Sequence, residues 1–309
     1  MSATAARVQI FRSLMFTPGQ RTRMVDKALA LGAASPDALL LDLEDAVPPA
    51  EKDAARSTVA MAIRRQRQRG HAIPALIVRV NSRATGRQED DIRAVVCADL
   101  TGILLPKVER PDEVRLASAL IEDLERSAGM PTGSIALVAA IESARAVHDV
   151  VHIAEADARL KGLMFGAEDY ARDLGLPVVR TGAAWELVFA RSAIVNAAAI
   201  AGIWAVDQVF MDFRDQDGER RDAIASRQLG FAGKCAIHPD QVPVLNEVFT
   251  PGAAEVAHAR AVVTAFAAAR ASGVGCVLMG GQVVEQPILD RAERVLRMHE
   301  AIESRAQVS

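Results

Sequence analysis

Short apolar segments alternate with longer amphipathic ones through the first 250 residues of this 309-residue chain, and this alternation limits the possible folds. Eight apolar segments have the length of buried strands, and consecutive ones begin roughly 25–40 residues apart. They lie at 14–16, 38–41, 75–80, 102–105, 135–141, 162–165, 205–211 and 233–237. Helical patterns fill the intervals, so neighbouring strands are expected to be parallel. We therefore predict a TIM (β/α)₈ barrel. An open doubly wound sheet is the alternative, but no G-x-G-x-x-G motif follows the first strand.

The residues after position 250 do not continue the strand–helix repeat. Two helical patterns, at 251–271 and 287–305, flank a glycine-rich segment at 273–284 that predicts a hairpin or a mobile flap. We divide the chain into a barrel domain, residues 1–250, and a C-terminal extension, residues 251–309. The extension is predicted to be a lid or an oligomer contact, roles that appendages of closed barrels often have.

The composition argues against several kinds of partner. The net charge of −3, from 36 basic and 39 acidic residues, gives no general attraction to nucleic acid or to an anionic membrane. No apolar run approaches the ~20 residues of a membrane span. The N-terminus has no signal-like apolar core, so we expect a cytoplasmic protein. Cys97, Cys235 and Cys276 are isolated and are expected to be small apolar groups rather than nucleophiles.

Acidic residues follow two neighbouring strands of the predicted barrel. Glu142 comes directly after the strand at 135–141, and Asp169 follows the strand at 162–165. A helical pattern at 144–158 joins the two strands, so both acids are expected at the same end of adjacent parallel strands. Two carboxylates suit Mg²⁺, which takes the rest of its oxygen ligands from water and substrate. The alternative is that each acid caps the following helix, but two acids on neighbouring strands favour a Mg²⁺ site.

Polar residues also end other predicted strands. They are Asp42, Glu44 and Asp45 after the second strand, Arg79 and Asn81 at the third, Lys107 after the fourth and His238 after the eighth. In a barrel these residues converge on the carboxyl-end mouth, where binding and catalysis take place. Arg79 lies in an apolar strand, so we expect an ion pair with Glu44. Its guanidinium also suits a substrate carboxylate or a thioester oxygen, and both roles can hold together. His238 is expected to pack or form hydrogen bonds rather than to catalyse.

Basic residues surround the first strand and helix. Arg12, Arg21, Arg23 and Lys27 lie around the turn FTPGQRTRMVDK, and cations near a helix N-terminus can bind phosphate. The alternative is solvated surface charge, which the residues alone favour.

Seven motifs, taken in order, give the chain a strong family resemblance. They are RSLMFTPG, LLLDLEDAV, VRVN, LLPKVE, AAIESA, FGAEDYARDLG and GKCAIHP. From about residue 12 to the final helix, the chain resembles the citrate lyase β-subunit (CitE-like) branch of the HpcH/HpaI aldolase family, which is related to malyl-CoA and citramalyl-CoA lyases. The resemblance implies a TIM barrel and a Mg²⁺-dependent lyase that cleaves carbon–carbon bonds in acyl thioesters.

The resemblance also implies roles for individual residues. It implies Glu142 and Asp169 as metal ligands, Arg79 and Glu44 as catalytic residues, and Arg79, Arg12, Arg21, Lys27, Ala167 and Glu168 as substrate- or coenzyme A-binding residues. The expected substrate is a malyl-, citramalyl- or citryl-type 3-hydroxyacyl thioester. Its expected products are an acetyl thioester and glyoxylate, pyruvate or oxaloacetate. The alternatives are thioester hydrolysis, a subunit acting on an acyl carrier protein within a citrate lyase complex, and a coenzyme A-binding scaffold.

One motif departs from the family pattern. Malyl-CoA and citramalyl-CoA lyases carry D-G-x-x-V-D-x-P, whose second aspartate reaches a neighbouring subunit's site as an acid or base. Here the sequence is GGQVVEQP, with Gly280 at the first aspartate and Glu285 at the catalytic position. A shift on the order of 1 Å can cost ~10²-fold in rate. Either the loop compensates and Glu285 acts as the catalytic carboxylate, or the substrate or activity differs. The resemblance also implies a homotrimer or a dimer of trimers.

Overall fold

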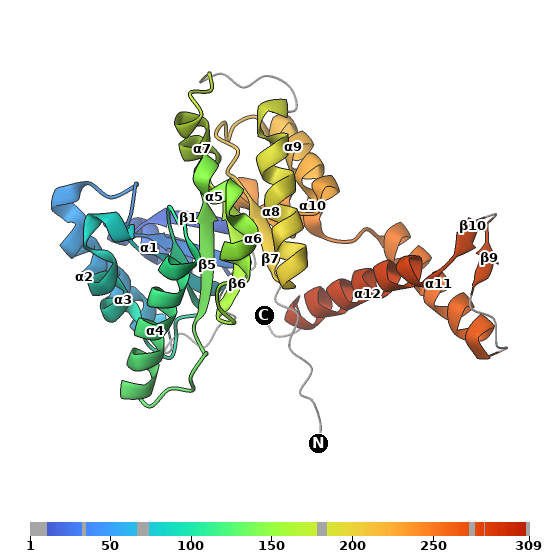
Figure 1. Ribbon diagram of the computed structural model, residues 1–309, viewed down its shortest axis with the longest axis horizontal. Coiled ribbons are helices and arrows are strands. Elements are labelled where there is room, and N and C mark those ends of the chain that lie inside the picture. The colour runs from blue at the N-terminus through green and yellow to red at the C-terminus, as the bar shows by residue number, and fades with distance from the viewer. Residues whose placement is uncertain are drawn as a thin grey trace. The chain divides into compact units, whose positions relative to one another are not determined.

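Eight parallel strands close into a barrel in the order of the chain (Figure 1). The computed structural model describes residues 11–32, 35–66, 74–177, 184–271, 276–280 and 282–306. The strands are β1 Ser13–Pro18, β2 Ala38–Asp42, β3 Ala75–Arg79, β4 Gly102–Leu105, β5 Ala136–Ile141, β6 Leu160–Phe165, β7 Trp204–Asp207 and β8 Gly233–Ala236. Pairing of β1 with β8 completes the ring, which confirms the predicted TIM barrel.

The barrel interior is a packed core. Strands such as β2 are buried along their whole length, because one face meets the interior and the other meets the helices. The interior residues share one apolar cluster, which includes Leu14, Leu40, Ile77, Leu104, Val138, Met164, Val206 and Cys235. Since this cluster fills the interior, a ligand of the barrel binds above the strand ends and not between the strands.

Helices surround the strands. They are α1 Thr22–Leu29, α2 Lys52–Gln66, α3 Gln88–Val95, α4 Pro111–Ser127, α5 Ala144–His148, α6 Val150–Ala154, α7 Ala167–Asp173, α8 Val188–Ala201, α9 Gln216–Leu229 and α10 Gln241–Phe249, with 3₁₀ turns η2 Pro49–Glu51, η3 Arg83–Thr85 and η4 Trp185–Leu187. In the described part of the chain, none of the helices combines the length and apolar character of a membrane span.

Two local predictions need correction, and two helices were not predicted. The helix predicted at 144–158 is two short helices, because Asp149 between them takes a non-helical backbone (φ −97°, ψ 9°). Helices α7 and α10 were not predicted; each begins within a few residues of a strand end, where the apolar pattern is too short to reveal it. The strand predicted at 205–211 ends at Asp207, the last residue that pairs with β8.

A buried ion pair closes the amino end of the barrel between α4 and β6. Arg159 donates from Nη1 and Nη2 to the two carboxylate oxygens of Glu125, at 2.9 Å each. Glu125 also accepts the backbone N–H groups of Gly133 and Ile135, at 2.8 Å each. Burial alone raises the pKa of Glu125, but these donors outweigh it and lower the pKa to about 2. The pair lies at the end opposite the mouth, so it serves stability.

The chain divides into two compact units, with the boundary between Asn246 and Glu247. In the second unit, α11 Ala253–Ala271 packs against α12 Gln286–Ala306 through a small apolar core. The predicted hairpin is present as the antiparallel pair β9 Val277–Met279 and β10 Gln282–Val284; residues 272–275 and 281 lie outside the described residues.

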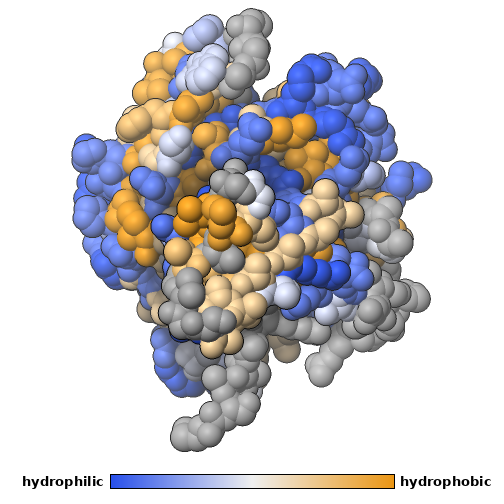
Figure 2. Space-filling model, turned by 90° about the vertical axis from the view of Figure 1, so that its right-hand side faces the viewer, coloured by the Kyte–Doolittle hydropathy of each residue, from blue (hydrophilic) through white to orange (hydrophobic). Residues whose placement is uncertain are grey.

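Some apolar side chains remain exposed. Leu278 and Val283 of the hairpin are 71% and 51% exposed. Exposed apolar groups occur elsewhere as well, and Figure 2 shows hydrophobic patches between hydrophilic ones on the face that it presents.

Candidate active site

The two predicted metal ligands lie together at the mouth, the carboxyl end of the strands. Glu142 directly follows β5, and Asp169 lies in the first turn of α7, just after β6. The last residues of these strands, Ile141 and Phe165, are paired, so both acids are held at one level. Both line a cavity of about 90 Å³, whose other walls include Met164, Phe165, Val209, Cys235 and Phe16. A cavity with apolar walls and two carboxylates on one side can hold a small ligand that carries or recruits positive charge.

Glu142 is a buried carboxylate, only 7% exposed. Its pKa is raised to about 7, chiefly by burial and further by the charges of Glu44 and Asp169, against the opposing charges of Arg79 and Lys107. The backbone N–H of Lys107 donates to its Oε2 at 3.2 Å. The poorly compensated charge of Glu142 would be relieved by a cation in the cavity.

Gly166 makes room for the Glu142 side chain. A Cβ atom at position 166 would lie 2.3 Å from the Cγ of Glu142 and 2.6 Å from its Oε1. Any other residue there would therefore push the carboxylate away from the end of β6.

The donor set at the mouth fits Mg²⁺. In the described ranges, no three His, Cys, Asp or Glu side chains converge as a metal cage would require. Two carboxylates beside an open cavity are the arrangement that Mg²⁺ uses, because it keeps water ligands and binds substrate oxygens. Ca²⁺ needs more protein oxygens, and Zn²⁺ favours His and Cys.

Arg79, the last residue of β3, is held mainly by Asp42. Its Nε and Nη2 atoms each lie 2.7 Å from an oxygen of Asp42, and Nη1 lies 3.1 Å from Oε2 of Glu44. The expected partner, Glu44, is therefore only the second one. The reason is register: Asp42 and Arg79 are direct neighbours on β2 and β3, which lets the planar guanidinium bind Asp42 with two bonds. Burial lowers the pKa of Arg79, but Asp42 outweighs burial and raises it above its usual value.

Lys107 was noted at a strand end but given no role in the sequence-based site. Its Nζ donates to Glu44 and to both oxygens of Asp45, at 3.1 and 3.2 Å, and lies 3.8 Å from Oδ2 of Asp169. Burial lowers the pKa of Lys107, but bonds to Glu44 and Asp45 raise it well above the usual value, so the ammonium group stays charged. Its sequence signal is its position two residues after the end of β4, within the motif LLPKVE.

The predicted phosphate-binding cations do not form one group. Arg21 directly precedes α1 and Lys27 lies in its last turn, and both side chains are exposed. Helix α1 follows the carboxyl end of β1. Arg12 precedes β1 and binds Asp37 with Nε at 2.9 Å and Nη2 at 2.8 Å. A six-residue strand spans about 20 Å, so Arg12 lies at the opposite end of the barrel. The predicted grouping of Arg12 with Arg21 and Lys27 is wrong because its motif runs along the whole strand.

The remaining predicted residues occupy different environments. Ala167 is buried and Glu168 is exposed in the first turn of α7, and both line the cavity. Glu285 is exposed between β10 and α12 of the second unit, so its catalytic role stays a prediction. His238 is half-buried and stacks on Phe213 with ring centroids 4.6 Å apart.

The fold and the mouth together define a (β/α)₈ enzyme whose site can hold one hard divalent cation and a small anionic substrate. A model of the HpcH/HpaI aldolase/citrate lyase family matches residues 12–239. The chain therefore belongs to the HpcH/HpaI aldolase/citrate lyase family, and it is a lyase.

Relatives of known name cover almost the whole chain. Citrate lyase subunit beta of Leuconostoc mesenteroides subsp. cremoris is 39% identical over 290 residues, which are 94% of this chain and 93% of that protein. L-malyl-CoA/beta-methylmalyl-CoA lyase of Cereibacter sphaeroides is 34% identical over 309 residues, with 94% and 95% covered. The structure of CitE from Mycobacterium tuberculosis, in complex with magnesium, acetoacetate and coenzyme A, has a TM-score of 0.73 and 31% identity, covering 96% of this chain and 100% of that one.

Proposed function

We propose that the chain cleaves a carbon–carbon bond in a 3-hydroxyacyl thioester, with Mg²⁺ as cofactor, to give an acetyl thioester and a 2-keto acid. The observation that carries this proposal is the buried Glu142 beside Asp169 in one cavity. The names of the malyl-CoA lyase relative and of the CitE complex with magnesium and coenzyme A support the same substrate and cofactor classes.

The reaction balances without another reactant. In malyl-CoA, the bond between the hydroxyl-bearing carbon and the methylene carbon next to the thioester breaks. The hydroxyl group loses its proton and becomes the carbonyl of glyoxylate. The electron pair of the broken bond passes to the methylene carbon, which forms a thioester enolate and then takes up one proton to give acetyl-CoA. No oxidant, reductant or water is consumed.

Glu142 and Asp169 would hold the ion. Bound there, Mg²⁺ supplies a Lewis acid that acidifies the substrate hydroxyl and polarises the carbonyl that forms. Arg79 keeps its charge in the mouth, held by Asp42 and Glu44 and stacked 4.9 Å from the ring centroid of Phe16, which lines the cavity. A fixed positive charge in this position stabilises the negative charge that develops on the enolate oxygen.

The thioester carrier has a separate binding region in this proposal. Arg21 precedes the first residue of α1 and Lys27 lies on this helix, and both are exposed cations. The helix begins close to the carboxyl end of β1. Cations beside a helix N-terminus bind phosphate groups well. We therefore assign these residues to the phosphates of coenzyme A, while Ala167 and Glu168 border the acyl group in the cavity.

Residues 251–309 are proposed to act as a lid and an oligomer contact. The exposed Leu278 and Val283 on the hairpin support such a contact, since exposed apolar groups of this kind favour association. In this arrangement Glu285 enters a neighbouring subunit's site and delivers the proton to the enolate carbon. A homotrimer or a dimer of trimers is the proposed assembly. A cytoplasmic location is proposed as well, and the three free thiols fit a reducing compartment.

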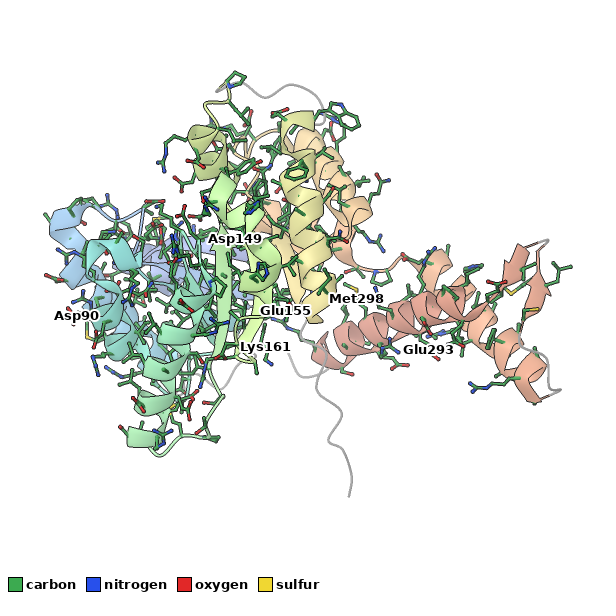
Figure 3. The ribbon with its side chains drawn as sticks, in the orientation of Figure 1. Asp90, Asp149, Glu155, Lys161, Glu293 and Met298 are labelled. Carbon is green, nitrogen blue, oxygen red and sulfur yellow. The ribbon has the colours of Figure 1, made fainter. Side chains whose placement is uncertain are left out.

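Purified protein with Mg²⁺ and malyl-CoA, citramalyl-CoA or citryl-CoA tests the proposal. Keto acid is measured as its phenylhydrazone, and free thiol is measured in parallel. We expect keto acid from at least one thioester, and a loss of at least ~10²-fold in kcat for Glu142→Gln and Asp169→Asn. Glu155→Gln, an exposed residue labelled in Figure 3, is the matched control. Free thiol without keto acid would indicate hydrolysis instead, and no product from any thioester would reject the proposal.

A carrier protein in place of coenzyme A is the second candidate. The 39% identity with a citrate lyase subunit beta, over 93% of that protein, favours it. The same cleavage assay with a citryl thioester on a phosphopantetheinylated acyl carrier protein decides between them. Turnover on the carrier protein that exceeds turnover on citryl-CoA would establish this version.

A further inference from the structure

The mouth contains more carboxylates than a Mg²⁺ site needs. Besides the exposed Glu168, five lie at the ends of β2, β5 and β6, namely Asp42, Glu44, Asp45, Glu142 and Asp169. Ca²⁺ takes six to eight oxygen ligands in flexible geometry, whereas Mg²⁺ needs few protein carboxylates and keeps its water. A mouth with this many free carboxylates would therefore favour Ca²⁺. The interactions that hold Asp42, Glu44 and Asp45 in place therefore decide which ion the site prefers.

Asp42 is withheld by Arg79 and the backbone. Both of its oxygens are bound by the guanidinium at 2.7 Å, and they also accept the N–H groups of Glu44 and Ala46 at 2.9 and 3.1 Å. Asp42 is also buried, so it cannot turn toward the cavity without breaking four bonds. This carboxylate is fixed by the fold.

Glu44 and Asp45 are withheld by a side chain that can be replaced. Lys107 holds them with its ammonium group: Nζ donates to both residues and lies 3.8 Å from Asp169, which lines the cavity. Glu44 also faces Arg79 at 3.1 Å, but Asp45 is 3.9 Å from that guanidinium and has Lys107 as its close partner. The ammonium group of Lys107 thus reaches Glu44, Asp45 and Asp169 at once, while Arg172 pairs with the other oxygen of Asp169.

The main-chain conformation of Lys107 also acts on the metal site, because it directs the N–H group toward Glu142. Its φ of 53° lies in the left-handed region, which a residue other than glycine seldom takes. This backbone lets the N–H of Lys107 donate to Glu142 while the side chain crosses to Glu44 and Asp45. Backbone strain of this kind persists where the surrounding structure depends on it.

We propose that Lys107 sets the metal preference of the mouth. Its ammonium group withholds Glu44 and Asp45 from the ion, and its backbone N–H orients Glu142, so that two carboxylates remain and Mg²⁺ is preferred to Ca²⁺. The inference rests on the proposed function, because it concerns the same ion. It makes Lys107 a positioning residue, since it acts on the ligands and not on the substrate.

Metal binding by the full-length protein tests this role without turnover. Isothermal titration calorimetry gives Kd for Mg²⁺ and Ca²⁺ with wild type, Lys107→Met, Lys107→Gln and Lys107→Arg. Met and Gln remove the charge, and two replacements guard against one that fails to fold. We expect Kd for Ca²⁺ to fall at least about tenfold in both, with less than about a threefold change for Mg²⁺, because new carboxylates join the larger ion. Lys107→Arg is expected to keep the wild-type preference.

Two further variants separate this role from a general charge effect. Lys161→Met removes the same charge from an exposed residue near the amino end of β6, labelled in Figure 3, and is expected to leave the preference unchanged. Glu44→Gln in the Lys107→Met background is expected to reverse most of the Ca²⁺ gain. An unchanged Ca²⁺/Mg²⁺ ratio in Lys107→Met and Lys107→Gln, or an equal shift in Lys161→Met, overturns the inference and leaves the proposed function standing. Wild-type protein that binds neither ion overturns both.

Discussion

The buried carboxylate of Glu142 makes Mg²⁺ binding depend on pH, which gives the strictest test of the site. Its pKa is raised to about 7 by burial first and by Glu44 and Asp169 next, in the metal-free protein. A metal ligand must lose its proton before it binds. With this pKa, about a tenth of Glu142 is ionised at pH 6 and about nine tenths at pH 8. The apparent Kd for Mg²⁺ is therefore expected to be about tenfold weaker at pH 6 than at pH 8.

The raised pKa of Glu142 also makes the stability of the folded protein depend on pH. Because the pKa of Glu142 is higher in the folded protein than its ordinary value of 4.5, the folded state binds more protons between these values. Stability of the metal-free protein therefore falls as pH rises from about 4.5 to about 7, by up to about 3 kcal/mol from this group. Bound Mg²⁺ offsets that loss, so its stabilising effect should be greater at pH 8 than at pH 6.

Calorimetric titrations with Mg²⁺ at pH 6, 7 and 8, and urea unfolding with and without Mg²⁺, measure both effects. Glu142→Gln cannot ionise, so its weak remaining Mg²⁺ binding should lose most of the pH dependence. Glu155→Gln is the control and should retain it, because this residue is exposed. Equal Mg²⁺ affinities at pH 6 and pH 8 in wild type would refute the reasoning.

Three substitutions test other parts of the structure. Arg159→Met leaves the buried Glu125 without its cation, so unfolding free energy in urea should drop by about 3–5 kcal/mol; a loss below 1 kcal/mol would contradict the pairing. Gly166→Ala places a methyl carbon 2.3 Å from the Cγ of Glu142, so calorimetry should show at least about tenfold weaker Mg²⁺ binding. Unchanged affinity would show that the Glu142 side chain can move aside. Asp42→Asn removes the charge that binds Arg79 through two hydrogen bonds, so kcat/KM should fall by about 10–100-fold. A change in kcat/KM of less than about twofold would show that Asp42 has a structural role alone.

Local patterns in the sequence were enough for the barrel and for the central pair of acids. The apolar segments repeat at strand length, and each strand–helix–strand unit can place its strands in only one common arrangement. Glu142 and Asp169 follow neighbouring strands, so the parallel arrangement alone brought them to one end. Neither conclusion needed side-chain geometry.

Partners at the mouth depended on features that a linear pattern does not contain. Strand register placed Asp42 rather than Glu44 against Arg79, because residues at the same level face each other directly. Strand length placed Arg12 at the far end of the barrel, although its motif continues to the mouth.

Lys107 shows the same limit most clearly. A left-handed backbone after β4 turned its N–H to one carboxylate and its ammonium group to others, and no local sequence signal specifies that turn. The sequence by itself determined which strands form and at which end their polar residues collect, because periodicity and chain direction are local properties. Only the tertiary structure decided which charge meets which, because that depends on register and backbone conformation across strands distant in the chain.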